Sequence, residues 1–357
     1  MRILKLFLLT AGLSLLVLAS CDLFIPKTEP GSRNYEWTLD TLYMPMNYIS
    51  SVWGASPDDV WAVGAGGTEY DRLLHYDGTQ WSTYTNEIIW CDGRIIFGFC
   101  ADDIWMGGQA GWLERGAGIW HYDGQQWKQH YVYSPEEPYR AIYIHDIWGS
   151  SPDNVYACGL RTFYDETNIF LCKGFVLHYD GTAWRELARA DFNSQFLRVR
   201  NENEIVYVTS YTIDPDTLSG GDYEFYQVKN DSSFYKIGSY KESKIRWIGL
   251  SSIDEKVYLT IGQNAYRYKK NKFKHFLYVD NEKFYNNVYG RSENDVFLSM
   301  RDGIMHYNGE DIEYIYESPS NDMDIFGTPL ILENDIFYSV RYPGFNELVL
   351  HGRLVEE

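Results

Sequence analysis

Two short sequence motifs recur in the same order along the chain, and this repeat limits the folds that the chain can adopt. SPDDVWAVG (56–64) precedes HYDGTQW (75–81), and SPDNVYACG (151–159) precedes HYDGTAW (178–184). Aligned on the Asp of HYDG, copies of the second motif lie 46, 57, 50, 39 and 39 residues apart, at Asp77, Asp123, Asp180, Asn230, Lys269 and Asn308. Self-similarity at a period of about 20–50 residues is typical of repeat proteins.

Each repeat predicts four short strands joined by tight turns. In the first unit, the strands are expected at YISSVWGA, VWAVG, RLLHYD and QWSTY. The SPDD and DG sequences between them are typical of turns, because Pro presets one dihedral angle, Asp bonds to the backbone and Gly accepts a positive φ. Aromatic residues form 17% of the chain, and they favour half-buried sheet surfaces. The chain is therefore expected to be all-β.

Four-stranded units in tandem predict a β-propeller, in which each unit is one blade. On these motifs the chain resembles bacterial envelope lipoproteins of the β-propeller superfamily, and in general architecture it resembles Kelch, WD and sialidase-like proteins. The resemblance covers about residues 35–355 and implies a fold rather than a function. Seven copies of the Asp-Val-Trp segment predict seven blades. These copies begin at Asp59, Asp103, Asn154, Glu204, Lys256, Asp295 and Asp335.

The seventh unit has sequence for three strands, of which ELVLHG is the last. A missing fourth strand would leave an exposed sheet edge, which proteins usually avoid. The segment YEWTLDTL (35–42) has Trp37 where the first unit has Trp81. We therefore expect this N-terminal strand to complete the last blade and to close the ring.

The first residues are typical of a sorting signal. Arg2 and Lys5 precede an apolar run from 6 to 18, which is too short to span a membrane. LASC (18–21) resembles a bacterial lipobox, which implies acylation of Cys21. We expect a signal peptide (1–20), a lipidated Cys with its tether (21–34) and a single propeller domain (35–357). The protein is then expected on the extracytoplasmic side of a bacterial cell envelope, held at a membrane by its lipid anchor alone.

Charge and motif content exclude several classes of function. The chain has 31 basic and 50 acidic residues, a net charge of −19, and such a surface repels nucleic acid. It has no phosphate-binding loop, no GxSxG elbow and no HExxH motif, so no positive sign of catalysis or of a cofactor is present.

The recurring polar residues favour structural roles. The Asp residues of the DG turns, Asp77, Asp123 and Asp180, are expected to stabilise turns rather than to catalyse a reaction. The histidines that precede them recur in different blades, too far apart to bind one metal ion, and are expected to pack or to hydrogen-bond. They are His75, His121, His178 and His306.

The cysteines leave two pairings open. Cys158 and Cys172 flank one connection and could form a disulfide, as could Cys91 and Cys100, because disulfides are stable outside the cytoplasm. Free buried thiols are the alternative.

Propeller geometry places the irregular loops on one side of the molecule. This side carries the connections between the second and third strands of each unit and between successive units, and is called the long-loop face below. Its loops are long in the first four units and short in the next two. Aromatic residues and Arg are common anchors at binding sites. The candidate ligand-binding residues are Tyr70, Trp90, Trp112, Arg115, Tyr139, Arg161, Phe163, Tyr164 and Tyr211.

The favoured function is a membrane-anchored binding module that recognises a protein or a carbohydrate (glycan) through this face of blades one to four. One alternative is a glycosidase or polysaccharide lyase, which would need two carboxylates roughly 5–10 Å apart at the ring centre. Another is a structural scaffold of an envelope or secretion assembly, and the long loops could also fold over each other without any partner. We expect a monomer with no metal and no cofactor.

Overall fold

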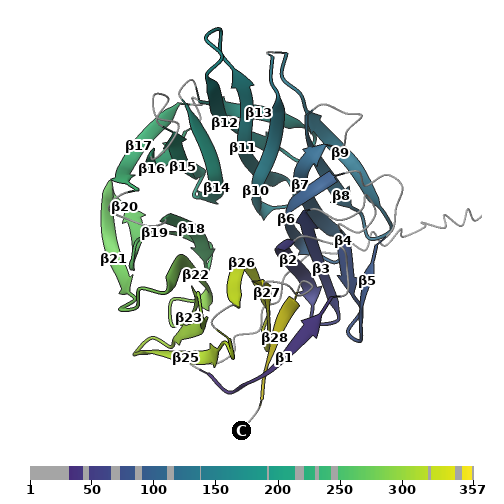
Figure 1. Cartoon of the computed structure of the whole chain (residues 1–357), viewed down its shortest axis with the longest axis vertical. Helices are drawn as coiled ribbons and strands as arrows, with labels where there is room; N and C mark the ends of the chain where they lie inside the picture. Colours follow the sequence, from purple (N-terminus) through teal and green to yellow (C-terminus); the bar gives the residue numbers. More distant parts are fainter. Residues whose placement is uncertain are drawn as a thin grey trace, which may run out of the picture.

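The computed structural model describes residues 32–42, 48–65, 73–84, 91–110, 116–136, 138–190, 193–213, 221–229, 233–242, 248–320, 323–341 and 348–355. Within these ranges the chain forms strands β1 to β28 and no helix. The strands form sheets arranged around a common centre, as Figure 1 shows down the axis of the ring. The predicted all-β propeller is confirmed.

Five of the sheets have four strands each, in sequence order. They are β6 (Cys91–Cys100), β7 (Asp103–Ala110), β8 (Ala117–Tyr122) and β9 (Trp127–Tyr133); β10 (Ala141–Ser151), β11 (Asn154–Tyr164), β12 (Phe170–Tyr179) and β13 (Trp184–Arg189); β14 (Ser194–Glu202), β15 (Ile205–Ile213), β16 (Gly221–Val228) and β17 (Phe234–Lys241); β18 (Ile248–Ile253), β19 (Lys256–Ile261), β20 (Asn264–Lys269) and β21 (Lys272–Tyr278); and β22 (Phe284–Ser292), β23 (Asp295–Met300), β24 (Gly303–Tyr307) and β25 (Ile312–Glu317).

The sixth sheet has eight strands in the order β1-β28-β27-β26-β2-β3-β4-β5. It consists of β1 (Tyr35–Thr41), β28 (Leu348–Leu354), β27 (Asp335–Arg341), β26 (Asp324–Ile331), β2 (Tyr48–Ser56), β3 (Asp59–Ala65), β4 (Leu73–Tyr76) and β5 (Trp81–Thr83). Its two halves meet at β26 and β2, which are joined by one parallel residue pair, Ser51 with Thr328.

The prediction of seven separate four-stranded blades is therefore wrong. The structure has five four-stranded blades, and the other eight strands form one continuous sheet. The number of sequence repeats gives the number of four-stranded units. The number of separate sheets also depends on whether the inner strands of two units lie close enough to form hydrogen bonds. The pairing of Ser51 with Thr328 connects two distant parts of the chain, and no local sequence signal specifies such a pair.

The N-terminal strand pairs with the last strand of the chain, as expected. β1 runs antiparallel to β28 from the pair Tyr35 with Leu354 to the pair Thr41 with Leu348. The indole N–H of Trp81 in β5 donates to Asp40 of β1 at 3.1 Å. β1 thus contacts both halves of the eight-stranded sheet.

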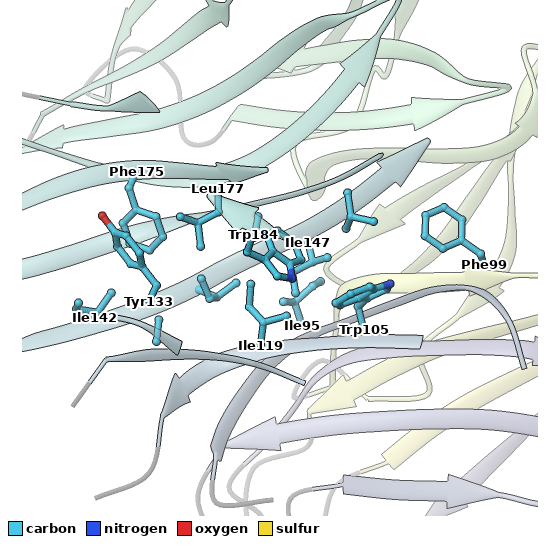
Figure 2. Packing of buried hydrophobic residues seen from close by; sticks show 14 residues of the cluster. Ile95, Phe99, Trp105, Ile119, Tyr133, Ile142, Ile147, Phe175, Leu177 and Trp184 are labelled. Carbon is cyan, nitrogen blue, oxygen red and sulfur yellow. The ribbon is translucent and has the colours of Figure 1, made fainter. Parts of the chain in front are cut away.

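Aromatic side chains fill the space between neighbouring sheets. Trp61 of β3 lies 5.6 Å from Trp127 of β9, and Trp105 of β7 lies 5.5 Å from Trp184 of β13, between ring centroids. Figure 2 shows Trp105 and Trp184 in one apolar layer with Ile95, from the sheets β6–β9 and β10–β13. Each such ring pair stabilises the fold by about 0.5–1.5 kcal/mol beyond its buried area. The repeated Trp residues therefore hold successive sheets together.

The fourth unit is shifted by one residue relative to the expected motif alignment. Glu204 was expected at the position of Asp59, but it has a positive φ of 64° and lies in the turn between β14 and β15. Ile205 is the first paired residue of β15, as Asp59 is of β3. Tyr207 consequently has the position of Trp61, which restores an aromatic residue there.

Candidate functional site

The recurring histidines lie within the sheets and are held by hydrogen bonds. His75 Nε2 lies 2.7 Å from Asp59 Oδ1 on the adjacent strand, and the Trp61 ring lies 4.2 Å from the His75 ring. The same pair recurs at His121 with Asp103, His178 with Asn154, His306 with Asp295 and His351 with Asp335. The expected packing and hydrogen-bonding role of these histidines is confirmed.

The DG turns are closed by their own aspartates. The hydroxyl of Thr79 and the backbone N–H groups of Gln80 and Thr79 donate to Asp77 Oδ1, and they lower the pKa of Asp77 to about 2. Gly78 follows with a φ of 86°, and a Cβ there would lie 2.8 Å from Asp58 of the neighbouring turn. The expected structural role of these aspartates is confirmed.

Four of the expected ligand-binding residues lie outside the described residues. They are Tyr70, Trp90, Trp112 and Arg115. The other five can be placed, and most of them lie near one hairpin of the third unit.

The hairpin of β11 and β12 is long and its turn is well ordered. Ten residue pairs connect the two strands, from Val155 with Tyr179 to Tyr164 with Phe170. At its end, Asp165 Oδ1 accepts hydrogen bonds from the backbone N–H groups of Thr167 and Ile169, at 2.9 and 2.8 Å. These bonds fix the turn and lower the pKa of Asp165.

Tyr164 is the exposed aromatic residue of this hairpin. Its side chain is 47% exposed, and its hydroxyl accepts a 2.7 Å hydrogen bond from Arg140. The guanidinium of Arg140 also lies over the Tyr164 ring, 5.5 Å from its centroid. The backbone N–H of Arg140 donates to the carbonyl of Thr162. The segment before β10 therefore packs on the hairpin and supplies an Arg beside Tyr164.

Phe163 and Tyr139 flank this pair without being fully exposed. Lys173 lies over the Phe163 ring at 5.6 Å, and the Tyr139 hydroxyl is 2.8 Å from Ser134 Oγ. Arg161 is only 3% exposed, so it does not belong to this surface.

Tyr211 lies in the next unit, on β15. It donates its hydroxyl proton to Glu242 at 2.7 Å, and burial together with this carboxylate raises its pKa to about 12. Its ring packs against Tyr223 at 5.0 Å. Its contacts are therefore within its own unit.

The expected disulfide between Cys158 and Cys172 is not formed. Cys158 and Cys172 are free and buried, because Cys158 lies opposite Val176 while Cys172 lies opposite Thr162, four residues further along β11. Cys100 is disulfide-bonded. The side chain of Cys91 lies outside the described residues, so its pairing with Cys100 stays a prediction.

A second cluster of polar residues belongs to β6, β10 and β14, three of the strands that border the ring centre in Figure 1. Each of the innermost strands β2, β6, β10 and β14 has a bulge, at which one residue has no pairing partner on the next strand of its sheet. These residues are Ser50, Arg94, His145 and Leu197. Such bulges turn a side chain out of the regular alternation. Arg94 of β6 and His145 of β10 are the bulged residues of two neighbouring inner strands.

His145 is held in a neutral form. Its Nδ1 lies 2.9 Å from the carbonyl oxygen of Phe196. Burial is the main reason that its pKa is lowered, to about 4, and the nearby Arg94 and Arg198 lower it further.

Asp146, next in the chain, is 1% exposed. Its Oδ2 accepts hydrogen bonds from Arg200 at 2.5 Å and from the Val199 N–H at 2.9 Å, and its Oδ1 lies 3.8 Å from Arg198. A carboxylate engaged in this way is not available as a general acid or base.

This cluster was not predicted from the sequence. The only signal for it was a polar residue in the otherwise apolar inner-strand segments GRIIFG and IYIHDIWG.

Comparison with known proteins supports the fold and no more. No protein-family model matches the chain, and no curated protein matches it in sequence. It is similar in structure to YCF48 bound to a D1 peptide, with a TM-score of 0.56 and 14% identity over 90% of this chain and 97% of that chain. It is also similar to a streptogramin B lyase (TM-score 0.60, 8% identity, 90% and 98% covered). Virginiamycin B lyase from Staphylococcus aureus gives a TM-score of 0.58 at 9% identity, with 90% and 100% covered.

Within the described ranges, no helix is both long and apolar enough to cross a membrane.

Proposed function

We propose that the protein is a lipid-anchored, extracytoplasmic binding module of a bacterial cell envelope that holds a partner protein against the long-loop face of its third unit. The observation that carries this proposal is the β11–β12 hairpin, whose ordered turn presents Tyr164 beside Arg140. Tyr and Arg are enriched among the residues that dominate protein interfaces. A turn that is already fixed loses little conformational entropy when a partner binds.

A protein partner is favoured over a glycan for two reasons. Arg140 already donates to the Tyr164 hydroxyl at 2.7 Å, so this hydroxyl cannot also accept a hydrogen bond from a sugar in the same position. The similar protein YCF48 is described in complex with a peptide, which supports peptide recognition as a use of this kind of propeller.

The proposed anchor leaves the propeller at a fixed place. Arg33, just before β1, forms ion pairs with Asp311 at 2.6 Å and Glu313 at 2.7 Å on the outer side of the β22–β25 sheet. Eleven residues lie between Cys21 and Arg33, and the twelve steps from one to the other span at most about 40 Å. The partner is therefore expected within a few nanometres of the membrane surface.

Site-specific photo-crosslinking tests this function. A photoreactive phenylalanine at position 164, in the full chain expressed in a bacterial envelope, is expected to give a discrete adduct that a protease degrades. Position 278 is the matched control, because Tyr278 is 48% exposed but lies on β21, away from the hairpin. An adduct that only glycosidases degrade would favour a glycan ligand. No adduct at position 164, or the same adduct at both positions, would refute the proposed surface.

A further inference from the structure

We propose that the ring centre contains a second binding site, for a small ligand with an oxyanion group such as a carboxylate or phosphate, contacted by Arg94 and Arg198 beside His145. This site goes beyond the proposed function and uses none of the residues of the β11–β12 hairpin, so either proposal can fail alone.

The three residues belong to neighbouring inner strands, close to an irregularity in each strand. The bulge in β6 falls between Gly93 and Ile95, and the bulge in β10 between Ile144 and Asp146. In β14 the ladder skips one residue just before Arg198. β6, β10 and β14 border the ring centre in Figure 1. Arg94 and Arg198 both lie close enough to His145 to act on it electrostatically.

Hydrogen bonds hold the neighbouring inner strands rigidly together at these bulges. Ser50 Oγ donates to the carbonyl oxygen of Gly93 at 3.1 Å, and His145 Nδ1 lies 2.9 Å from the carbonyl oxygen of Phe196. In both cases the residue at the bulge of one inner strand hydrogen-bonds to the backbone of the next inner strand, at the residue just before that strand's own bulge. The inner strands are therefore fixed relative to one another, and a site built on them is preorganised.

The residues around His145 carry more positive than negative charge. Arg200 contacts the Asp146 carboxylate at 2.5 Å, and Arg94 and Arg198 both act electrostatically on the neighbouring His145. Arg198 lies 3.8 Å from the other oxygen of Asp146, beyond hydrogen-bond distance. Arg94 stacks on the Tyr143 ring at 4.7 Å. Among the described residues Arg94 therefore has no ion pair, and Arg198 has only the long contact with Asp146, in a protein with a net charge of −19.

The guanidinium groups of Arg94 and Arg198 have hydrogen-bond donors that could bind a ligand. Arg94 Nε is buried and has no hydrogen-bond partner in the described part of the chain. The Arg198 side chain is 28% exposed, so solvent and small solutes can reach it. Guanidinium groups bind carboxylates and phosphates through two parallel hydrogen bonds, and they do so most strongly away from bulk water. An oxyanion at this place would supply both the missing charge and the missing acceptors.

Calorimetry with simple anions tests the site. The probes are succinate, inorganic phosphate and chloride at equal ionic strength, added to the full chain. At least one of the two oxyanions is expected to bind saturably and to raise the melting temperature, whereas chloride does neither. Arg94→Gln and Arg198→Gln are each expected to weaken that binding about tenfold or more, because each removes charged hydrogen bonds.

Arg185→Gln is the matched control, because Arg185 is 62% exposed and paired with Asp180 on the outside of the ring. Its anion affinity should equal that of the parent chain. The absence of saturable binding for both oxyanions would overturn the proposal, as would parent-like affinity in both inner variants. Folding does not confound the test: replacing an uncompensated Arg94 should leave the melting temperature of the anion-free protein unchanged or higher. The crosslink at position 164 should persist in Arg94→Gln.

Discussion

Trp37 of β1 donates its indole N–H to the carbonyl oxygen of Ile315 in β25, 2.9 Å away in space and 278 positions later in the chain. Its ring also lies 5.1 Å from the ring of Tyr316, between centroids. β1 therefore contacts the β22–β25 sheet in addition to its pairing with β28. The stability of the whole ring should accordingly depend on one N-terminal strand.

Replacing Trp37 by Ala is expected to lower the free energy of unfolding by about 2–4 kcal/mol, because it removes a large side chain packed between two sheets. Urea denaturation measures this change. Leu39→Ala is the control on the same strand, since Leu39 is 40% exposed, and its effect should stay within about 0.5 kcal/mol. Equal effects of the two variants would show that β1 does not join the sheets.

Replacing His306 by Ala should destabilise the protein more than the same change at His275. His306 is fully buried and 2.7 Å from Asp295, so its loss leaves a cavity and one hydrogen bond fewer to a buried carboxylate. We expect a loss of about 2–4 kcal/mol. His275 is exposed, 3.1 Å from Asn264, and its removal should cost less than about 1 kcal/mol. A thermal or urea midpoint that falls equally in both variants would contradict the structural role of the His–Asp pair.

The hydrogen bonds of the DG turns predict a specific response to acid. The pKa of Asp77 is lowered from 3.8 to about 2, so the folded state favours the ionised form. The stabilisation is complete above pH 3.8 and is lost as the pH falls toward 2. An NMR titration of the Asp77 carboxyl group measures this pKa directly. A value near 3.8 would mean that the turn does not hold the carboxylate.

His145 is expected to titrate well below an ordinary histidine. Its pKa is lowered from 6.5 to about 4, chiefly by burial, so the folded state favours the neutral ring. The stabilisation from neutral His145 is therefore complete above pH 6.5 and decreases as the pH falls toward 4. Arg94→Gln should raise this pKa, because it removes a nearby positive charge. Imidazole NMR signals report both values, and an ordinary pKa in the parent chain would place His145 in bulk water.

The sequence predicts the local parts of this fold well. The DG and SPDD turns, the strands around them and the pairing of residues 35–42 with the last strand follow from local turn chemistry and from the need to cover a sheet edge. Trp61 and Trp105 recur at equivalent positions of two units, and this repeat indicates a packing position between neighbouring sheets. In the structure both residues lie at such interfaces.

The errors concern features that depend on distant parts of the chain. The Ser51–Thr328 pair that merges two units depends on how closely the ring packs. The motif was misaligned at Glu204 because this acidic residue belongs to the two-residue turn, where Asn203 and Glu204 both have a positive φ, and not to the strand that follows. Cys158 and Cys172 flank one loop in sequence, but the strand register keeps them four residues apart.

The candidate sites were predictable to different degrees. Tyr164 was identified because long loops with aromatic residues indicate binding surfaces. Arg140 was missed, because its contact with Tyr164 joins two separate segments. The inner-strand cluster was missed as well, since a bulge that redirects Arg94 or His145 leaves no pattern in the sequence beyond a polar residue in an apolar strand.

The most direct test of the binding account is to shorten the β11–β12 hairpin. Replacing residues 163–171 by a two-residue Asn-Gly turn removes Tyr164 and the Asp165 turn but keeps the inner part of both strands. The protein crosslinked at position 164 in the parent chain should no longer copurify with the shortened chain, while the melting temperature changes by no more than a few degrees. Retention of that protein by a stably folded, shortened chain would contradict the account.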